Sequence, residues 1–182
     1  GMAGALVMYL YSAGPKPISH TPIGEIVAGS TMGFGIVTTV VFIHSNVLNV
    51  ETFLIALPTS VFIGTILLTN NLSDHNEDRM VGRKTLVIVM GINRGEWLWV
   101  AACMSLLALT GLFVFMDLWP VHSLILVLLL FPYKKVLQFR RIEKRVKNKG
   151  MMMGLIGKVG IRFHGALILG MMLSKAFAFV RL

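Results

Sequence analysis

The sequence predicts an all-α protein, a multi-spanning transmembrane bundle of about five to six membrane helices. Hydrophobic residues make up 55% of the 182-residue chain, and only 14% of its residues are charged. Soluble domains carry about 25% charged residues. The apolar residues also gather in runs that mostly approach the roughly 20 residues needed to cross a bilayer. A soluble fold of this size has too little interior to bury so much apolar surface, so we expect lipid to be its solvent.

Six apolar segments follow one another along the chain. They cover residues 1–13, 24–44, 52–69, 97–115, 120–133 and 163–180. The first lacks the basic start of a signal peptide, so we interpret it as the last turns of a membrane helix whose beginning is missing. The fifth has 14 residues before Lys134, and we expect it to continue as a helix whose basic side chains extend toward the membrane surface. We therefore expect one membrane domain over residues 1–182, incomplete at its N-terminus.

The basic residues indicate how the chain is oriented. The net charge is +9, and 15 of the 17 Lys and Arg residues fall in three alternate loops, whereas the loops at 45–51 and 116–119 hold none. This alternation is typical of a multi-pass protein with its basic loops in the cytoplasm. We expect a bacterial plasma membrane location and no nucleic-acid partner. The run Lys134–Lys149 is either an interfacial helix on anionic lipid head groups or a solvated loop.

The stretch Asn70–Leu86, NNLSDHNEDRMVGRKTL, is the part of the sequence that indicates chemistry. Asp74 and Asp78 are four positions apart, so both carboxylates would share one face if the helix of residues 52–69 continued through them. Like charges in that arrangement repel unless a cation lies between them. A hard divalent ion such as Mg²⁺ accepts carboxylate oxygens and keeps positions free for phosphate. Asn70 and Asn71 add neutral polar groups nearby.

Two cations follow this pair. Arg83 can hold a phosphate group through two hydrogen bonds, and Lys84 acts as a mobile point charge. Carboxylates followed by Gly82 and then by cations therefore favour a diphosphate site that also holds Mg²⁺. Spacing alone leaves open a solvated loop of mixed charge.

The same stretch resembles the second aspartate-rich motif of the UbiA-type intramembrane prenyltransferases. The match lies at Asn70 or Asn71, Asp74, Asp78, and Gly82 to Leu86. A second stretch, Tyr11–Glu25 (YSAGPKPISHTPIGE), resembles the Tyr-Thr-Gly-Gly-Pro-x-Pro loop of the branch that prenylates 1,4-dihydroxy-2-naphthoate in menaquinone synthesis. The family's first aspartate-rich motif has no counterpart, because Asp117 is the only further aspartate. The resemblance thus implies that this chain corresponds to the later part of a nine-helix fold. We expect it to be inactive as a fragment.

The resemblance also implies a reaction and roles for residues. A polyprenyl group would pass from a polyprenyl diphosphate to dihydroxynaphthoate, with loss of CO₂. Asp74 and Asp78 would hold Mg²⁺ and Tyr11 would face the reacting groups, unless it is an interfacial aromatic anchor. The remaining predicted residues would contact the diphosphate: Arg83, Lys84, Lys16, Asn70 and Asn71. Lys16 alternatively reflects only the bias of basic residues toward the cytoplasm.

Two other functions compete with this interpretation. A UbiA-type relative could act on another aromatic acceptor, such as 4-hydroxybenzoate, but the Gly14–Pro17 loop favours the naphthoate branch. A membrane transporter subunit would share the hydrophobicity and the topology. A transporter predicts charged groups inside its membrane spans, whereas Asp74 and Asp78 are predicted in a cytoplasmic loop.

Overall fold

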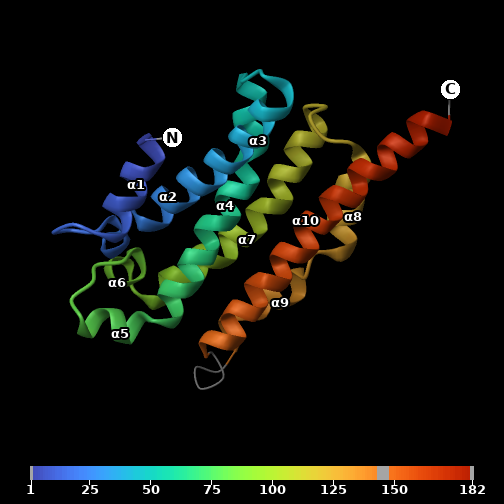
Figure 1. Ribbon diagram of the computed structural model, residues 1–182. Helices are drawn as coiled ribbons and strands as arrows, with labels where there is room; N and C mark the ends of the chain where they lie inside the picture. The colour runs from blue at the N-terminus through green and yellow to red at the C-terminus, as the bar shows by residue number, and fades with distance from the viewer. Residues whose placement is uncertain (1, 143–147, 181–182) are drawn as a thin grey trace.

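The computed structural model describes residues 2–142 and 148–180, and all regular elements within these ranges are helical (Figure 1). The long helices are α4 (Val50–Ser73), α7 (Ile92–Phe115) and α10 (Lys149–Val180). A further span is built end to end from α2 (Gly24–Ala28), the π-helical η2 (Gly29–Phe34) and α3 (Gly35–Ser45). The shorter elements are α1 (Met2–Ser12), η1 (Ile18–His20), α5 (His75–Met80), α6 (Leu86–Met90), α8 (Val121–Leu130), α9 (Tyr133–Gln138) and η3 (Phe139–Arg141).

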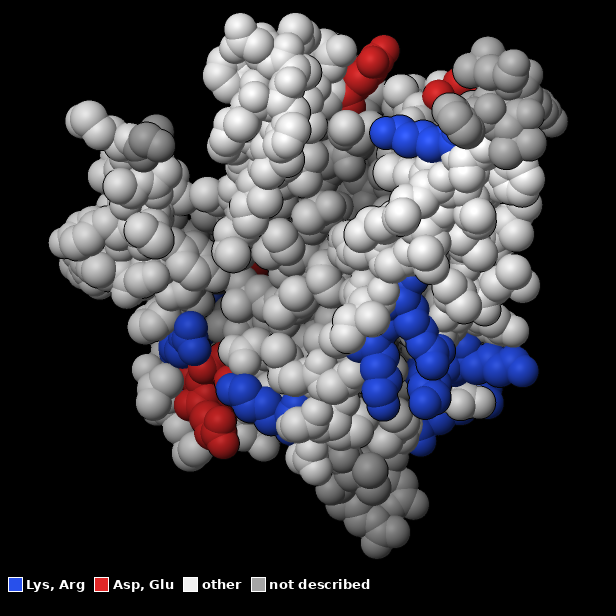
Figure 2. Space-filling model, turned by 45° about the vertical axis from the view of Figure 1, so that its right-hand side comes forward, with Lys and Arg blue, Asp and Glu red and all other residues white. Residues whose placement is uncertain are grey.

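The predicted membrane bundle is confirmed. Among the described residues, four helical segments are long and apolar enough to cross a bilayer, namely Gly24–Ser45, Val50–Ser73, Ile92–Phe115 and Lys149–Phe177. The bent pair Val121–Leu130 and Tyr133–Arg141 makes a fifth if it counts as one span. In Figure 2 most Lys and Arg side chains gather at one end of the molecule, next to a broad band with almost no charge. This distribution suits a protein whose middle lies in lipid.

Helix α4 lies at the centre and contacts α2, η2, α3, α7 and α10. Glycines allow its close approach to the first span. A Cβ atom at Gly33 would lie 2.3 Å from the Ser60 Cα atom, and one at Gly29 would lie 2.6 Å from the Ser60 carbonyl oxygen. Small residues are the usual means by which membrane helices pack backbone against backbone. The first span is therefore held against the middle of α4, and the C-terminal end of α4 leads directly into the predicted motif.

A buried aromatic cluster joins α4, α7 and η3. The Trp99 side chain is fully buried, and its Nε1 atom donates a hydrogen bond to the Thr69 hydroxyl at 2.7 Å. Its ring stacks on Phe139 with centroids 4.2 Å apart. The indole donor is thus satisfied inside an apolar core, as a buried tryptophan requires.

Several boundaries differ from the prediction. The fifth segment does not continue as one helix, because Pro132 lacks a backbone donor and Phe131 before it is extended, so the axis bends by 50°. Helix α10 begins at Lys149 rather than near Phe163, which places Lys158 and Arg162 inside the helix. Within the run Lys134–Lys149, the residues Lys144, Arg145 and Lys147 lie outside the described residues.

Gly33→Leu tests the close approach of η2 to α4. A leucine side chain would collide with the Ser60 backbone, so we expect a loss of about 1–3 kcal/mol in the free energy of unfolding. Gly35→Leu is the matched control, because a Cβ atom at Gly35 has no atom within 4 Å. Thermal unfolding of both variants in detergent measures the difference. Equal melting temperatures would contradict the packing described here.

Candidate active site

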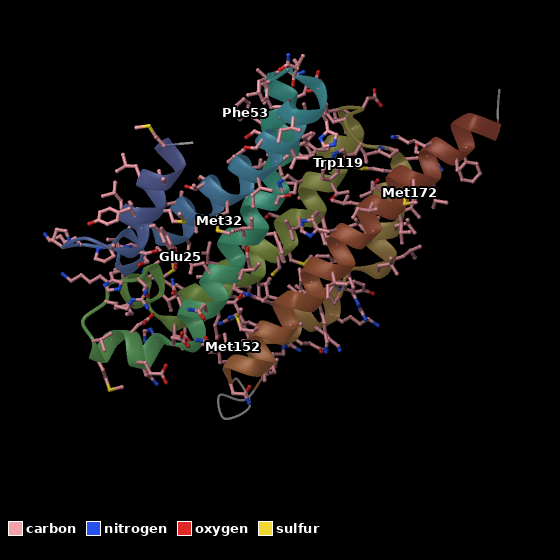
Figure 3. All side chains as sticks on the ribbon, in the orientation of Figure 1. Glu25, Met32, Phe53, Trp119, Met152 and Met172 are labelled. Atoms are coloured by element: carbon pink, nitrogen blue, oxygen red, sulfur yellow. The ribbon has the colours of Figure 1, made fainter. Side chains whose placement is uncertain are left out.

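Asn71, in the last turn of α4, is hydrogen-bonded to the first turn of α2. Its Nδ2 atom donates to Glu25 Oε1 at 2.8 Å, and both residues are buried. The approach is tight at this point, since a Cβ atom at Gly64 would lie 3.1 Å from the Glu25 carbonyl oxygen. Figure 3 shows Glu25 near the start of α2, at the same end of the bundle as α5 and α6. The motif and the Tyr11–Glu25 stretch therefore meet inside the protein.

Arg83 makes the second link between the same two stretches. Its Nη1 atom donates to Asp78 Oδ1 at 2.7 Å, and its Nη2 atom donates to the Ser19 carbonyl oxygen at 3.1 Å. The Lys84 backbone N–H donates to the His20 carbonyl oxygen at 2.9 Å. Gly82 has φ +73°, a left-handed conformation that glycine adopts without strain and that turns the chain back toward α5. The Asp78 side chain is only 6% exposed, so this ion pair is largely shielded from water.

Tyr11 lies close to these charges. It lies at the end of α1, which is not among the candidate membrane-spanning segments found within the described residues. Burial raises the pKa of the Tyr11 phenol, the negative charge of Glu25 raises it further, and the positive charge of Arg83 opposes both effects. The phenol therefore remains a neutral hydrogen-bond donor near Glu25 and Arg83 at neutral pH.

Asp74 has different partners from Asp78. Helix α4 ends at Ser73 and α5 begins at His75, so Asp74 occupies the break between them. Its Oδ2 atom accepts from Lys149 Nζ at 2.6 Å, and its Oδ1 atom accepts from the Ser73 hydroxyl at 3.0 Å. One aspartate therefore pairs with α10 and the other with the loop after α5. The continuous helix on which both would share one face is absent.

The unpartnered oxygen atoms at this site are suitable ligands for a hard cation such as Mg²⁺. Within the described residues, four buried side-chain oxygens have no hydrogen-bond partner: Glu25 Oε2, Asn71 Oδ1, Asp78 Oδ2 and Thr85 Oγ1. Carboxylate and amide oxygens are the groups that Mg²⁺ accepts. No cluster of three or more His, Cys, Asp or Glu side chains that could enclose an ion occurs within residues 2–142 and 148–180. The described residues therefore offer individual oxygen ligands and no closed cage.

An apolar cavity of about 440 Å³ begins at Glu25 and lies between the first span, α4 and α7. It is lined by Glu25, Ile26, Gly29, Ser30, Phe34, Leu57, Ser60, Val61, Gly64, Thr65, Leu68, Leu86, Leu98 and Ala102. Apart from Glu25, the lining residues are aliphatic or aromatic side chains, hydroxyls and glycines. A polar group at one end and an apolar lining elsewhere suit an amphipathic ligand.

The remaining predicted residues are Lys16, Lys84 and Asn70. Lys16 and Lys84 are exposed, and Asn70 lies in the last turn of α4, where its carbonyl oxygen accepts from the Asp74 N–H at 2.9 Å. The prediction of site residues missed Glu25. Its position was a usable signal, because an acidic residue at the start of a long apolar segment is costly in a membrane and usually functional.

Comparison with known proteins agrees with these features. The model of the UbiA prenyltransferase family matches residues 1–156. The chain is also 43% identical, over 91 residues, to the 1,4-dihydroxy-2-naphthoate octaprenyltransferase of Bacillus subtilis (strain 168). That match covers 50% of this chain and 29% of the relative, so it spans less than a third of the relative's length. No solved structure matches. Because the family model covers most of the sequence, the chain belongs to the UbiA prenyltransferase family.

Proposed function

We propose that this chain provides part of the active site of a Mg²⁺-dependent membrane prenyltransferase. The enzyme would transfer a polyprenyl group from its diphosphate to 1,4-dihydroxy-2-naphthoate, with release of CO₂, in menaquinone synthesis. Family membership and the name of the Bacillus subtilis relative support this reaction. The Tyr11–Glu25 loop, which resembles the naphthoate branch, supports the choice of acceptor.

The observation that carries the proposal is the meeting of a buried charged cluster and an apolar cavity at Glu25. Glu25 is hydrogen-bonded to the aspartate-rich motif through Asn71, and it also lines the cavity. A prenyl diphosphate has a multiply charged anionic head and a hydrocarbon tail, so it needs these two environments side by side. The tail gains roughly 25 cal/mol for each Å² of apolar surface removed from water.

Different residues of the cluster would bind Mg²⁺ and the diphosphate oxygens. Asp74 and Asp78 would hold Mg²⁺, which neutralises the charge of the leaving diphosphate when it is bound. Arg83 is already oriented by Asp78 and the Ser19 carbonyl, so its guanidinium can bind phosphate oxygens with little further ordering. Lys16, Lys84 and Asn70 would add charge and hydrogen bonds around the head group. The packed helices would keep water away from the reacting allylic carbon.

The orientation follows from the same charges. Most of the Lys and Arg side chains gather at the lower end of the molecule (Figure 2), which is the end that holds α5 and the start of α10 (Figure 1). Under the positive-inside rule this end would face the cytoplasm, with the protein in a bacterial plasma membrane. Water-soluble acceptors and Mg²⁺ would reach the site from that side.

Asp78→Asn tests the predicted head-group site. The change keeps the side-chain shape but removes the negative charge that would attract Mg²⁺ and that orients Arg83. We expect kcat/KM for the prenyl diphosphate to fall by about 10- to 100-fold or more, since an interaction with a charged group is worth about 1.5–3 kcal/mol. The assay follows transfer of a labelled prenyl group by the full-length protein in membrane vesicles, with dihydroxynaphthoate or 4-hydroxybenzoate as acceptor.

Asp117→Asn is the matched control for this experiment. Asp117 is exposed in the turn after α7 and has φ +57°, a conformation that asparagine tolerates well. We expect its activity to match the wild type. Full activity of Asp78→Asn at every Mg²⁺ concentration would refute the assigned site, and efficient prenylation of 4-hydroxybenzoate alone would refute the assigned acceptor.

Lys149→Ala tests whether Asp74 is a metal ligand. Lys149 is 57% exposed and pairs with Asp74, so a bound metal ion would have to displace an ammonium group held by a weak interaction. Removing the ammonium group should lower the Mg²⁺ concentration needed for half-maximal activity by up to about fivefold, the equivalent of about 1 kcal/mol. Titrating Mg²⁺ in the transfer assay measures this. Lys158→Ala, an exposed lysine of the same helix, should show no change. An increased Mg²⁺ requirement in Lys149→Ala would contradict the role given to Asp74.

A further inference from the structure

Glu25 has one carboxylate oxygen in use and one without a partner. Oε1 accepts the hydrogen bond from Asn71 Nδ2 at 2.8 Å. Oε2 is buried and has no hydrogen-bond partner within the described residues. The whole residue is only 5% exposed, and it lines the apolar cavity. A buried carboxylate oxygen without a donor is costly, which makes this position favourable for a ligand that brings one.

The chemistry of the two proposed substrates indicates which of them can donate a hydrogen bond to Glu25 Oε2. The prenyl chain has no hydrogen-bond donor. The diphosphate is an anion that a carboxylate without a metal ion repels, and the proposed function assigns Mg²⁺ to Asp74 and Asp78. The aromatic acceptor carries phenolic hydroxyl groups, and a hydrogen bond from O–H to a carboxylate is among the stronger kinds. Such a bond also increases the electron density of the aromatic ring, which favours attack on an electrophilic carbon.

The surroundings of Glu25 fit an aromatic acceptor at this place. The cavity begins at Glu25, so an acceptor hydrogen-bonded there would lie at the head of the space available for the prenyl chain. Tyr11 lies near enough for the Glu25 charge to raise the pKa of its phenol. On the other side, Asn71 holds the carboxylate in one orientation, and Asn71 is part of the aspartate-rich motif. Glu25 therefore lies between the predicted diphosphate residues and the cavity.

We propose that Glu25 binds the aromatic acceptor, its Oε2 atom accepting a hydrogen bond from one acceptor hydroxyl while Asn71 fixes Oε1. This inference rests on the proposed function and assigns the acceptor side of the same site. Glu25 contributes to acceptor affinity and to ring reactivity, and it leaves diphosphate binding to Arg83 and the two aspartates.

The experiment combines Glu25→Gln with a change in the acceptor. Glutamine keeps the shape and still accepts from Asn71, but it presents an amide in place of the free carboxylate oxygen. The full-length protein in membrane vesicles is assayed with 1,4-dihydroxy-2-naphthoate and with each of its two monomethyl ethers, at saturating prenyl diphosphate and fixed Mg²⁺. We expect kcat/KM for the parent acceptor to fall by about 10- to 100-fold in Glu25→Gln, the worth of a hydrogen bond to a charged group.

The decisive result is whether the effect of Glu25→Gln on kcat/KM depends on methylation of an acceptor hydroxyl. The wild type should discriminate against one monomethyl ether by a similar factor, and Glu25→Gln should lose this discrimination, because both changes remove the same hydrogen bond. The KM for prenyl diphosphate and the Mg²⁺ requirement should stay within about twofold of the wild type. Glu51→Gln, an exposed glutamate in the first turn of α4, is the control and should behave like the wild type.

Three results would overturn the inference. Undiminished discrimination between the ethers by an active Glu25→Gln would show that the hydroxyl binds elsewhere. A raised Mg²⁺ requirement with an unchanged acceptor KM would assign Glu25 to the metal. Equal use of both ethers and the parent acceptor by the wild type would overturn it even if Glu25→Gln failed to fold. A wild type that prenylates none of these acceptors would instead refute the proposed function.

Discussion

The Arg83 guanidinium joins the two polar stretches on which the site depends. It is paired with Asp78, five residues before it in the sequence, and it donates to the carbonyl of Ser19, 64 residues away. The Asn71–Glu25 hydrogen bond spans a similar distance in sequence and lies on the same pair of segments. A buried charge without such partners would be strongly destabilising beside a membrane. The charged cluster is therefore also the contact that fixes the loop before α2 onto the end of α4.

Close packing of the first span makes this contact possible. Gly29 and Gly33 allow η2 to rest on the Ser60 backbone of α4, and Gly64 lets the Glu25 backbone come near. These glycines remove side chains from one side of the interface, and the apolar cavity lies along the same helices. One arrangement thus places a carboxylate at the end of an apolar space, which is what an amphipathic substrate requires.

The sequence predicted the class of fold because lipid leaves few alternatives. Apolar runs of sufficient length must form helices when no water is present to satisfy the backbone. Local breaks were harder to predict. Pro132 was visible in the sequence, but 14 apolar residues are too few to cross a bilayer, so continuation of the helix was expected. The structure shows the bend through the extended backbone at Phe131. The start of α10 at Lys149 was hidden by the basic residues that precede its apolar half.

The residue types of the proposed site could be read from the sequence, but the contacts between them could not. Residue types at fixed spacing indicated Asp74, Asp78 and Arg83, since those patterns are local. Other ion-pair and hydrogen-bond partners of the motif residues, in contrast, lie far from them in the sequence. Lys149 pairs with Asp74 across 75 residues, and Glu25 meets Asn71 across 46 residues, and neither separation leaves a pattern in the sequence. Long-range polar contacts of this kind depend on how the helices pack, which a single sequence does not specify.

A structure of the full-length protein with Mg²⁺ and a non-hydrolysable prenyl thiodiphosphate would test the proposed substrate site. We expect diphosphate oxygens within hydrogen-bond distance of the Arg83 guanidinium and the prenyl chain in the cavity between η2, α4 and α7. A diphosphate bound away from Arg83, with that cavity empty, would contradict the proposed site.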